Sequence, residues 1–80
     1  MTIGDELKRE MQQAEQKYGL MHSTHEGLGV LVEEYDELKE AIHANDAAEI
    51  FREAVQVAAV AIRIAEAIGD PDFDERSGLD

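Results

Sequence analysis

Two glutamates, Glu34 and Glu37, are the residues in this chain most suited to chemistry. On a helix of about 3.6 residues per turn they share one row with Val30 and Ala41, so both carboxylates lie beside small or apolar neighbours. A half-sheltered carboxylate is less hydrated, which disfavours its charge unless a cation is near. The row indicates either a divalent-cation site or a solvated acidic rim. This segment alone favours the rim, because Glu-x-x-Glu is frequent in helices.

A second row of the same kind follows in residues 47–68, where Glu53 and Gln56 are interrupted by apolar residues. If the two rows face each other, both glutamates of the first row meet Glu53, and three carboxylates converge. Like charges raise one another's pKa, and Mg²⁺, a hard cation that prefers oxygen ligands, would relieve the repulsion. The alternative is that Glu53 pairs with a neighbouring arginine at a wet helix surface.

His22 and His25 flank the expected start of the second helix, where backbone dipoles favour anions. They could bind metal or contact phosphate there, or they could be exposed or hydrogen-bonded to backbone. Gly27 and Gly29 follow in the first turns of this helix. Because each lacks a side chain, they permit close approach of another part of the chain or of a ligand.

The composition of the chain restricts its partners. Its 80 residues make one small domain, and its formal charge of -12 repels DNA and RNA backbones, so we expect no binding to nucleic-acid polymers. The chain has no cysteine, and no segment is long and uninterrupted enough to span a bilayer. These features favour a cytoplasmic protein without membrane contact.

The helical periodicity predicts an all-α fold with helices over about 3–18, 24–44 and 47–68. Capping pairs mark the three starts: Thr2 with Asp5, Ser23 with Glu26, and Asp46 with Glu49. The turn after Ala44 is so short that the second and third helices must form an antiparallel hairpin. The first helix shows no chemistry and is expected to pack over the other helices or a partner subunit. Residues 1–69 form the domain, and 70–80 are expected to be an acidic flexible tail.

The apolar surface of the third helix is too broad for one neighbouring helix to cover. One stripe comprises Ile50, Ala54, Val57, Ala61, Ile64 and Ile68, and a second comprises Phe51, Val55, Ala58, Ile62 and Ala65. The second helix carries a stripe of its own at Leu31, Tyr35, Leu38 and Ile42. In so short a chain, self-association is the simplest way to bury these surfaces. We therefore expect a homodimer or homotetramer with a four-helix-bundle core.

The segment HSTHEGLGVLVEEYDELKEAI, followed by REAVQVAAVAIR, resembles the MazG-like all-α nucleoside triphosphate pyrophosphohydrolases, especially the short forms found in bacteriophages. The resemblance runs from His22 to about Ala67, more than half of the chain. It implies a helical bundle that uses Mg²⁺, with Mn²⁺ as a substitute, to hydrolyse a nucleoside triphosphate to the monophosphate and pyrophosphate. It also implies work in the cytoplasm of a bacterium or a phage-infected host.

The resemblance assigns the site residues by position. Glu33, Glu34 and Glu37 match the family's E-E-x-x-E element, and Glu53 matches the first acid of E-x-x-D. Gln56 stands where the family has Asp; its carbonyl can ligate a hard cation but carries no charge. Either fewer metal ions bind, another carboxylate such as Glu49 substitutes, or activity has been lost.

In this interpretation all five matched positions are metal ligands, and Glu34, Glu37 and Glu53 also carry the catalytic role. A glutamate not fully engaged with metal would accept a proton from the water that attacks the α-phosphorus. Four cationic or titratable side chains are candidates for holding phosphate oxygens: Arg63, Lys39, His22 and His25. Two other hypotheses stay open. One is a MazG-like module that binds nucleotide or a protein partner without turnover, and the other is an unrelated helical interaction module.

Overall fold

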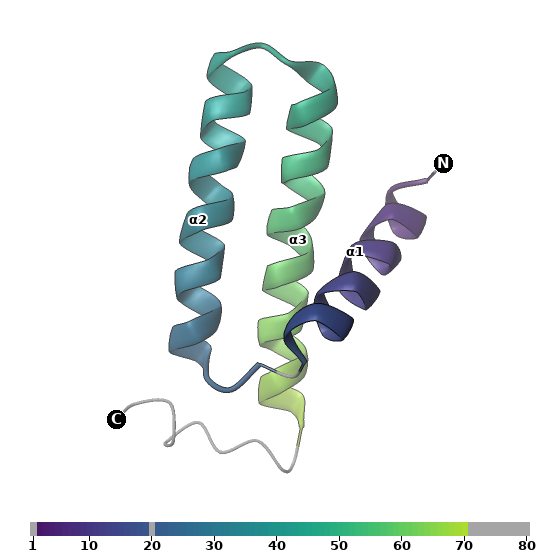
Figure 1. The fold of residues 1–80 in the computed structure, drawn as a ribbon, viewed down its shortest axis with the longest axis vertical. Coiled ribbons are helices and arrows are strands. Elements are labelled where there is room, and N and C mark those ends of the chain that lie inside the picture. The colour runs from purple at the N-terminus through teal and green to yellow at the C-terminus, as the bar shows by residue number, and fades with distance from the viewer. Residues whose placement is uncertain (1, 20, 71–80) are drawn as a thin grey trace.

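The computed structural model describes residues 2–19 and 21–70 and confirms the all-α prediction. Within these ranges the chain forms α1 (Ile3–Tyr18), α2 (Thr24–His43) and α3 (Ala47–Gly69), with no strand (Figure 1). Most of the predicted acidic tail, residues 71–80, lies outside the described residues. In the part that is described, no helix is long and apolar enough to cross a membrane.

Each helix begins at its predicted capping residue. The side chains of Thr2, Ser23 and Asp46 each accept a hydrogen bond from the backbone amide three residues later, at 3.1, 3.0 and 3.2 Å. Such caps satisfy one of the backbone donors left free at a helix start. Asn45 closes α2 in the left-handed conformation with φ of 56°. The chain therefore reverses within three residues, and the predicted antiparallel hairpin is confirmed.

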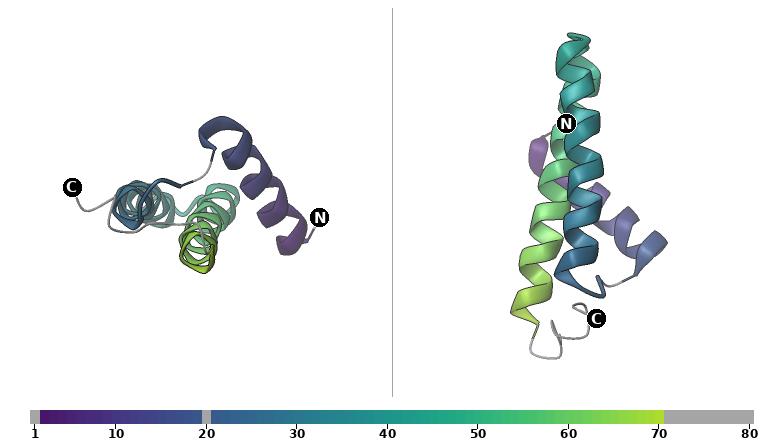
Figure 2. Two further views of the ribbon diagram at one scale, coloured as in Figure 1. Left: turned by 90° about the horizontal axis from the view of Figure 1, so that it is seen from below. Right: turned by 90° about the vertical axis from the view of Figure 1, so that its left-hand side faces the viewer.

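α2 and α3 pack closely along their length, and α1 crosses α3 obliquely (Figure 2). The two rows in which polar residues alternate with small or apolar ones, described above for residues 30–41 and 47–68, face each other across the hairpin. Val30, Glu34 and Ala41 turn inward from α2, and Glu53 and Val60 turn inward from α3. The core of the single chain is small. Within residues 2–19 and 21–70 the buried apolar residues are Met21, Ala41, Val55, Ala59 and Val60, and no side chain in these ranges is fully buried.

Most of the exposed large apolar side chains in the described chain lie on another surface, the outer apolar face. Its α2 residues are Leu28, Leu31, Tyr35, Leu38 and Ile42, and its α3 residues are Phe51, Ala54, Ala58, Ala61, Ala65 and Ile68. On α2, Tyr35 is 56% and Ile42 49% exposed, and on α3 Ile68 is 53% exposed. The α2 stripe predicted from the sequence is therefore left largely uncovered by the chain's own helices.

The outer apolar face lies on one side of the hairpin. On each helix the residues of the outer apolar face lie to one side of the inward-facing row when the helix is viewed down its axis. Glu37 on α2 and Gln56 on α3 lie to the other side of that row. Because the two helices are antiparallel, these displacements place both apolar stripes on one side and the polar residues on the other. α1 packs on the polar side, through Glu10 and Gln56.

Gly27 is a point of close approach between α2 and the rest of the chain. A Cβ there would lie 2.7 Å from Cγ1 of Ile64 and 2.8 Å from Sδ of Met21, whereas one at Gly29 would meet nothing within 4 Å. The predicted close approach is therefore confirmed at Gly27 and absent at Gly29.

These two glycines give a matched pair of variants. Gly27→Ala should lower the free energy of unfolding by about 1–3 kcal/mol, because the new methyl group displaces packed side chains. Gly29→Ala should raise it by about 0.5–1 kcal/mol, because alanine restricts the unfolded chain more than glycine does. Urea unfolding followed by circular dichroism checks both. Equal effects at the two positions would contradict the packing described at Gly27.

Candidate functional site

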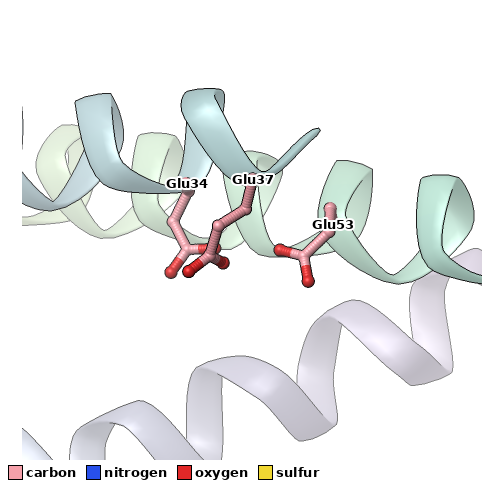
Figure 3. A group of neighbouring side chains, drawn as sticks. All are labelled: Glu34, Glu37 and Glu53. Carbon is pink, nitrogen blue, oxygen red and sulfur yellow. The ribbon is translucent and has the colours of Figure 1, made fainter. Parts of the chain in front are cut away.

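Three carboxylates from two helices converge on the polar side of the hairpin. Glu34 and Glu37 come from α2 and Glu53 comes from α3, and each offers an oxygen within 4.8 Å of those of the other two. Figure 3 shows the three side chains directed to the side on which α1 passes. The two interrupted rows thus face each other, as the convergence of the acids requires.

Two oxygens of this group are buried without a hydrogen-bond partner among the described residues: Oε2 of Glu34 and Oε2 of Glu53. Glu53 is only 9% exposed. Its nearest cation is Arg52, whose Nε lies 3.8 Å from Oε1. Arg52 is itself 61% exposed and binds Glu49 as well, so it pairs at the rim and leaves the buried Oε2 unmatched. A buried carboxylate oxygen without a partner is costly, so the arrangement calls for a cation or a proton.

Burial and the closeness of the three carboxylates also raise the pKa values of Glu34 and Glu53. Burial raises the pKa of Glu34 to about 7, and the charges of Glu37 and Glu53 add to the effect. The pKa of Glu53 is also raised. Burial is the largest cause and the interaction with Glu37 the next, whereas the charge of Arg52 lowers the pKa. Without a cation, Glu34 and Glu53 therefore retain protons at a pH where an ordinary glutamate is ionised.

Gln56 extends the α3 row beyond Glu53, but its amide is engaged elsewhere. Its Nε2 donates a 2.6 Å hydrogen bond to Oε2 of Glu10 on α1. Glu10 was missed in the sequence, although a signal was present. It stands beside the apolar residues Leu7, Met11 and Ala14, in the same half-sheltered setting that singled out Glu34.

The other five side chains predicted for the site do not contact the three carboxylates through a hydrogen bond or an ion pair in the described ranges. Glu33 and Lys39 are exposed on α2, and both histidines are exposed at its start. The backbone N–H of His22 donates to Glu26 at 3.3 Å. Arg63 donates through Nη2 to the carbonyl of Gly19 at 3.1 Å, so it ties the end of α1 to α3. In the described ranges, no hydrogen bond or ion pair links these five residues to the three carboxylates.

An open hollow of about 280 Å³ adjoins the group toward the hairpin turn. It is lined by Glu37, Glu40, Ala41, Ala44, Asp46, Glu49 and Glu53. Five of these seven residues are acidic and none is basic, so an anion could enter only together with cations. Glu37 and Glu53 belong to both the hollow and the converging group, which makes the two continuous.

No family model matches the chain, and searches of curated proteins and of solved structures find no match either.

Proposed function

We propose that this protein is a Mg²⁺-dependent nucleoside triphosphate pyrophosphohydrolase, which converts a ribo- or deoxyribonucleoside triphosphate to its monophosphate and pyrophosphate. The observation that carries the proposal is the convergence of Glu34, Glu37 and Glu53, with two buried oxygens that have no hydrogen-bond partner in the described part of the chain. The donors are all carboxylate oxygens, which fit a hard cation such as Mg²⁺, or Mn²⁺ in its place. The MazG-like pattern in the sequence supplies the reaction class, and a nucleotide substrate implies work in the cytoplasm.

The three glutamates have different roles in this proposal. The buried oxygens of Glu34 and Glu53 would hold the cation, because nothing else among the described residues satisfies them. A bound divalent ion supplies charge neutralisation at the phosphates and lowers the pKa of an attacking water. Glu37 is the most exposed of the three and lines the hollow. It is therefore best placed to accept the proton of the water that attacks the α-phosphorus.

The hollow is suited to a phosphate chain carried with its cations, but it does not enclose a whole nucleotide. Its volume of about 280 Å³ is at the lower limit of ordinary ligand pockets, roughly 300–1,000 Å³. Its lining contains no aromatic residue to stack on a base. A second subunit or α1 would have to provide the rest of the nucleotide pocket.

We propose further that the protein is a homodimer with a four-helix-bundle core formed by α2 and α3 of two chains, with a homotetramer as a pair of such dimers. The outer apolar face supports this, because its residues recur at alternating spacings of three and four on both helices. That spacing is the seam of a left-handed helical bundle. The exposed alanines of α3 also allow close helix approach.

Ala58→Glu tests the assembly. Ala58 lies at the centre of the α3 stripe and is exposed in the single chain, so the substitution leaves the chain's own packing intact. In a symmetric dimer it buries like charges, and we expect the dimer dissociation constant to rise about a hundredfold or more. Ala48→Glu adds the same charge at an exposed alanine outside the stripe and should change nothing. Sedimentation of an 8.9 kDa chain measures the mass, and a monomeric unmodified protein would refute the dimer.

A second candidate function rests on Gln56. Its amide is engaged with Glu10, and it brings no negative charge to the site. A chain with too weak a cation site would bind nucleotide or a protein partner without turning it over.

Purified protein incubated with Mg²⁺ and a panel of canonical and modified nucleoside triphosphates separates the two candidates. Pyrophosphate release that stops in EDTA supports the enzyme. Magnesium-dependent nucleotide binding without pyrophosphate release, in both the unmodified protein and Gln56→Asp, supports the binding module. Neither binding nor turnover would leave only a helical interaction protein.

A further inference from the structure

The face of α1 that packs against α3 carries a carboxylate that bonds to the α3 row containing Glu53. Glu10 is half-buried there and accepts the 2.6 Å hydrogen bond from Nε2 of Gln56. Gln56 lies one turn after Glu53 on the same row of α3. The α1 ribbon passes on the side to which the three carboxylates point (Figure 3).

The direction of this hydrogen bond determines what Gln56 can do. An ionised carboxylate only accepts hydrogen bonds, so the amide nitrogen of Gln56 must face Glu10, and its carbonyl oxygen is directed away from it. Gln56 is thus a donor that holds a carboxylate in place. The negative charge that position 56 lacks is present one side chain farther out, on α1.

We propose that Glu10, held by Gln56, is the fourth carboxylate of the cation site and that α1 is part of that site. The inference rests on the proposed function and on the buried oxygen of Glu53, which has no hydrogen-bond partner among the described residues and which a cation would satisfy. Glu10 is not among the three acids whose oxygens lie within 4.8 Å of one another. Its place is therefore behind the direct ligands, accepting a hydrogen bond from a water on the cation, since Mg²⁺ keeps several of its waters when bound to proteins.

Removal of the charge of Glu10 separates this role from simple anchoring of α1, because a glutamine at this position can still accept the hydrogen bond from Gln56. Glu10→Gln should weaken Mn²⁺ binding about tenfold, as is usual for groups that support metal ligands. Glu15→Gln removes the same charge from an exposed position of α1 and should leave affinity within about twofold. Glu10→Gln with Gln56→Glu returns one carboxylate and one amide to the contact and should restore affinity to within about threefold.

Mn²⁺ affinity is measured by calorimetry on the full chain, with helix content checked by circular dichroism. Weaker Mn²⁺ binding in Glu10→Gln than in Glu15→Gln, at unchanged helix content, supports the proposal. If Glu10→Gln binds Mn²⁺ as tightly as Glu15→Gln does, the fourth carboxylate is refuted, while the proposed enzyme stands on its other three. If the unmodified protein binds no Mn²⁺ or Mg²⁺ at all, both the inference and the proposed function fail.

Discussion

Glu53→Gln is expected to abolish most of the proposed hydrolase activity, with kcat reduced about a thousandfold. Glu53 is the most buried of the three acids, and one of its oxygens has no partner in the described chain. An amide at this position keeps the shape of the side chain but removes the charge that would bind the cation, and with it much of the charge stabilisation at the phosphates. Pyrophosphate release at saturating Mg²⁺ measures the loss.

The same variant should be more stable than the unmodified protein in EDTA at pH 8. Burial raises the pKa of Glu53, so its ionised form is disfavoured in the folded chain, and the neutral amide relieves that cost. A higher melting temperature together with lost activity would identify a residue kept for function. Asp36→Asn, an exposed acid of α2 outside the site, should change neither quantity. Activity in Glu53→Gln equal to that of Asp36→Asn would refute the site.

In the absence of metal, the second large expected effect is a decrease in the free energy of unfolding as the pH rises. The pKa of Glu34 is raised from 4.5 to about 7 in the folded chain, so between these values the folded state binds a proton that the unfolded state releases. Protons therefore favour folding, and stability should fall as pH rises from about 4.5 to about 7, then level off. Each pKa unit corresponds to about 1.4 kcal/mol, and because Glu34 keeps some solvent contact we expect a loss of roughly 1–2 kcal/mol.

Mg²⁺ should reverse this loss, because in the proposed site it would bind the ionised carboxylates of the folded chain. Melting temperatures in EDTA and in Mg²⁺, at pH 5 and pH 8, should show a large stabilisation by the metal at pH 8 and little at pH 5. The chain is acidic throughout, so general charge repulsion also grows with pH. Glu34→Gln compared with Asp36→Asn removes that background, since both variants lose one charge. An unchanged slope in Glu34→Gln would show that Glu34 is not its source.

Much of the fold could be predicted from local sequence signals. The capping residues Thr2, Ser23 and Asp46 act within one helical turn, and Asn45 closes α2 through its own backbone conformation. These interactions are short in sequence, so their pattern is visible before any tertiary contact is known. The oligomer predicted from the breadth of the apolar surface stays a prediction, which the exposed stripes of α2 and α3 support.

The candidate site was predictable only in part. The rows containing Glu34 and Glu53 were evident from helical spacing. The short turn predicted an antiparallel hairpin, but the sequence left open whether the two rows face each other, and the structure shows that they do. Glu10 was missed because its relation to Gln56 spans 46 positions and depends on how α1 crosses α3. Periodicity within one helix carries no information about that crossing.

The sequence by itself determined the three helices, the hairpin and the acids available to it, because these depend on neighbours within a few residues. Only the tertiary structure decided that Glu53 would be buried with an oxygen unsatisfied, that Arg63 would bind the Gly19 carbonyl, and that Gln56 would hold Glu10. The physical reason is that burial and hydrogen-bond partners are set by the angle and register of packed helices. Helix positions follow from local sequence, but the contacts between side chains of different helices depend on how those helices are packed.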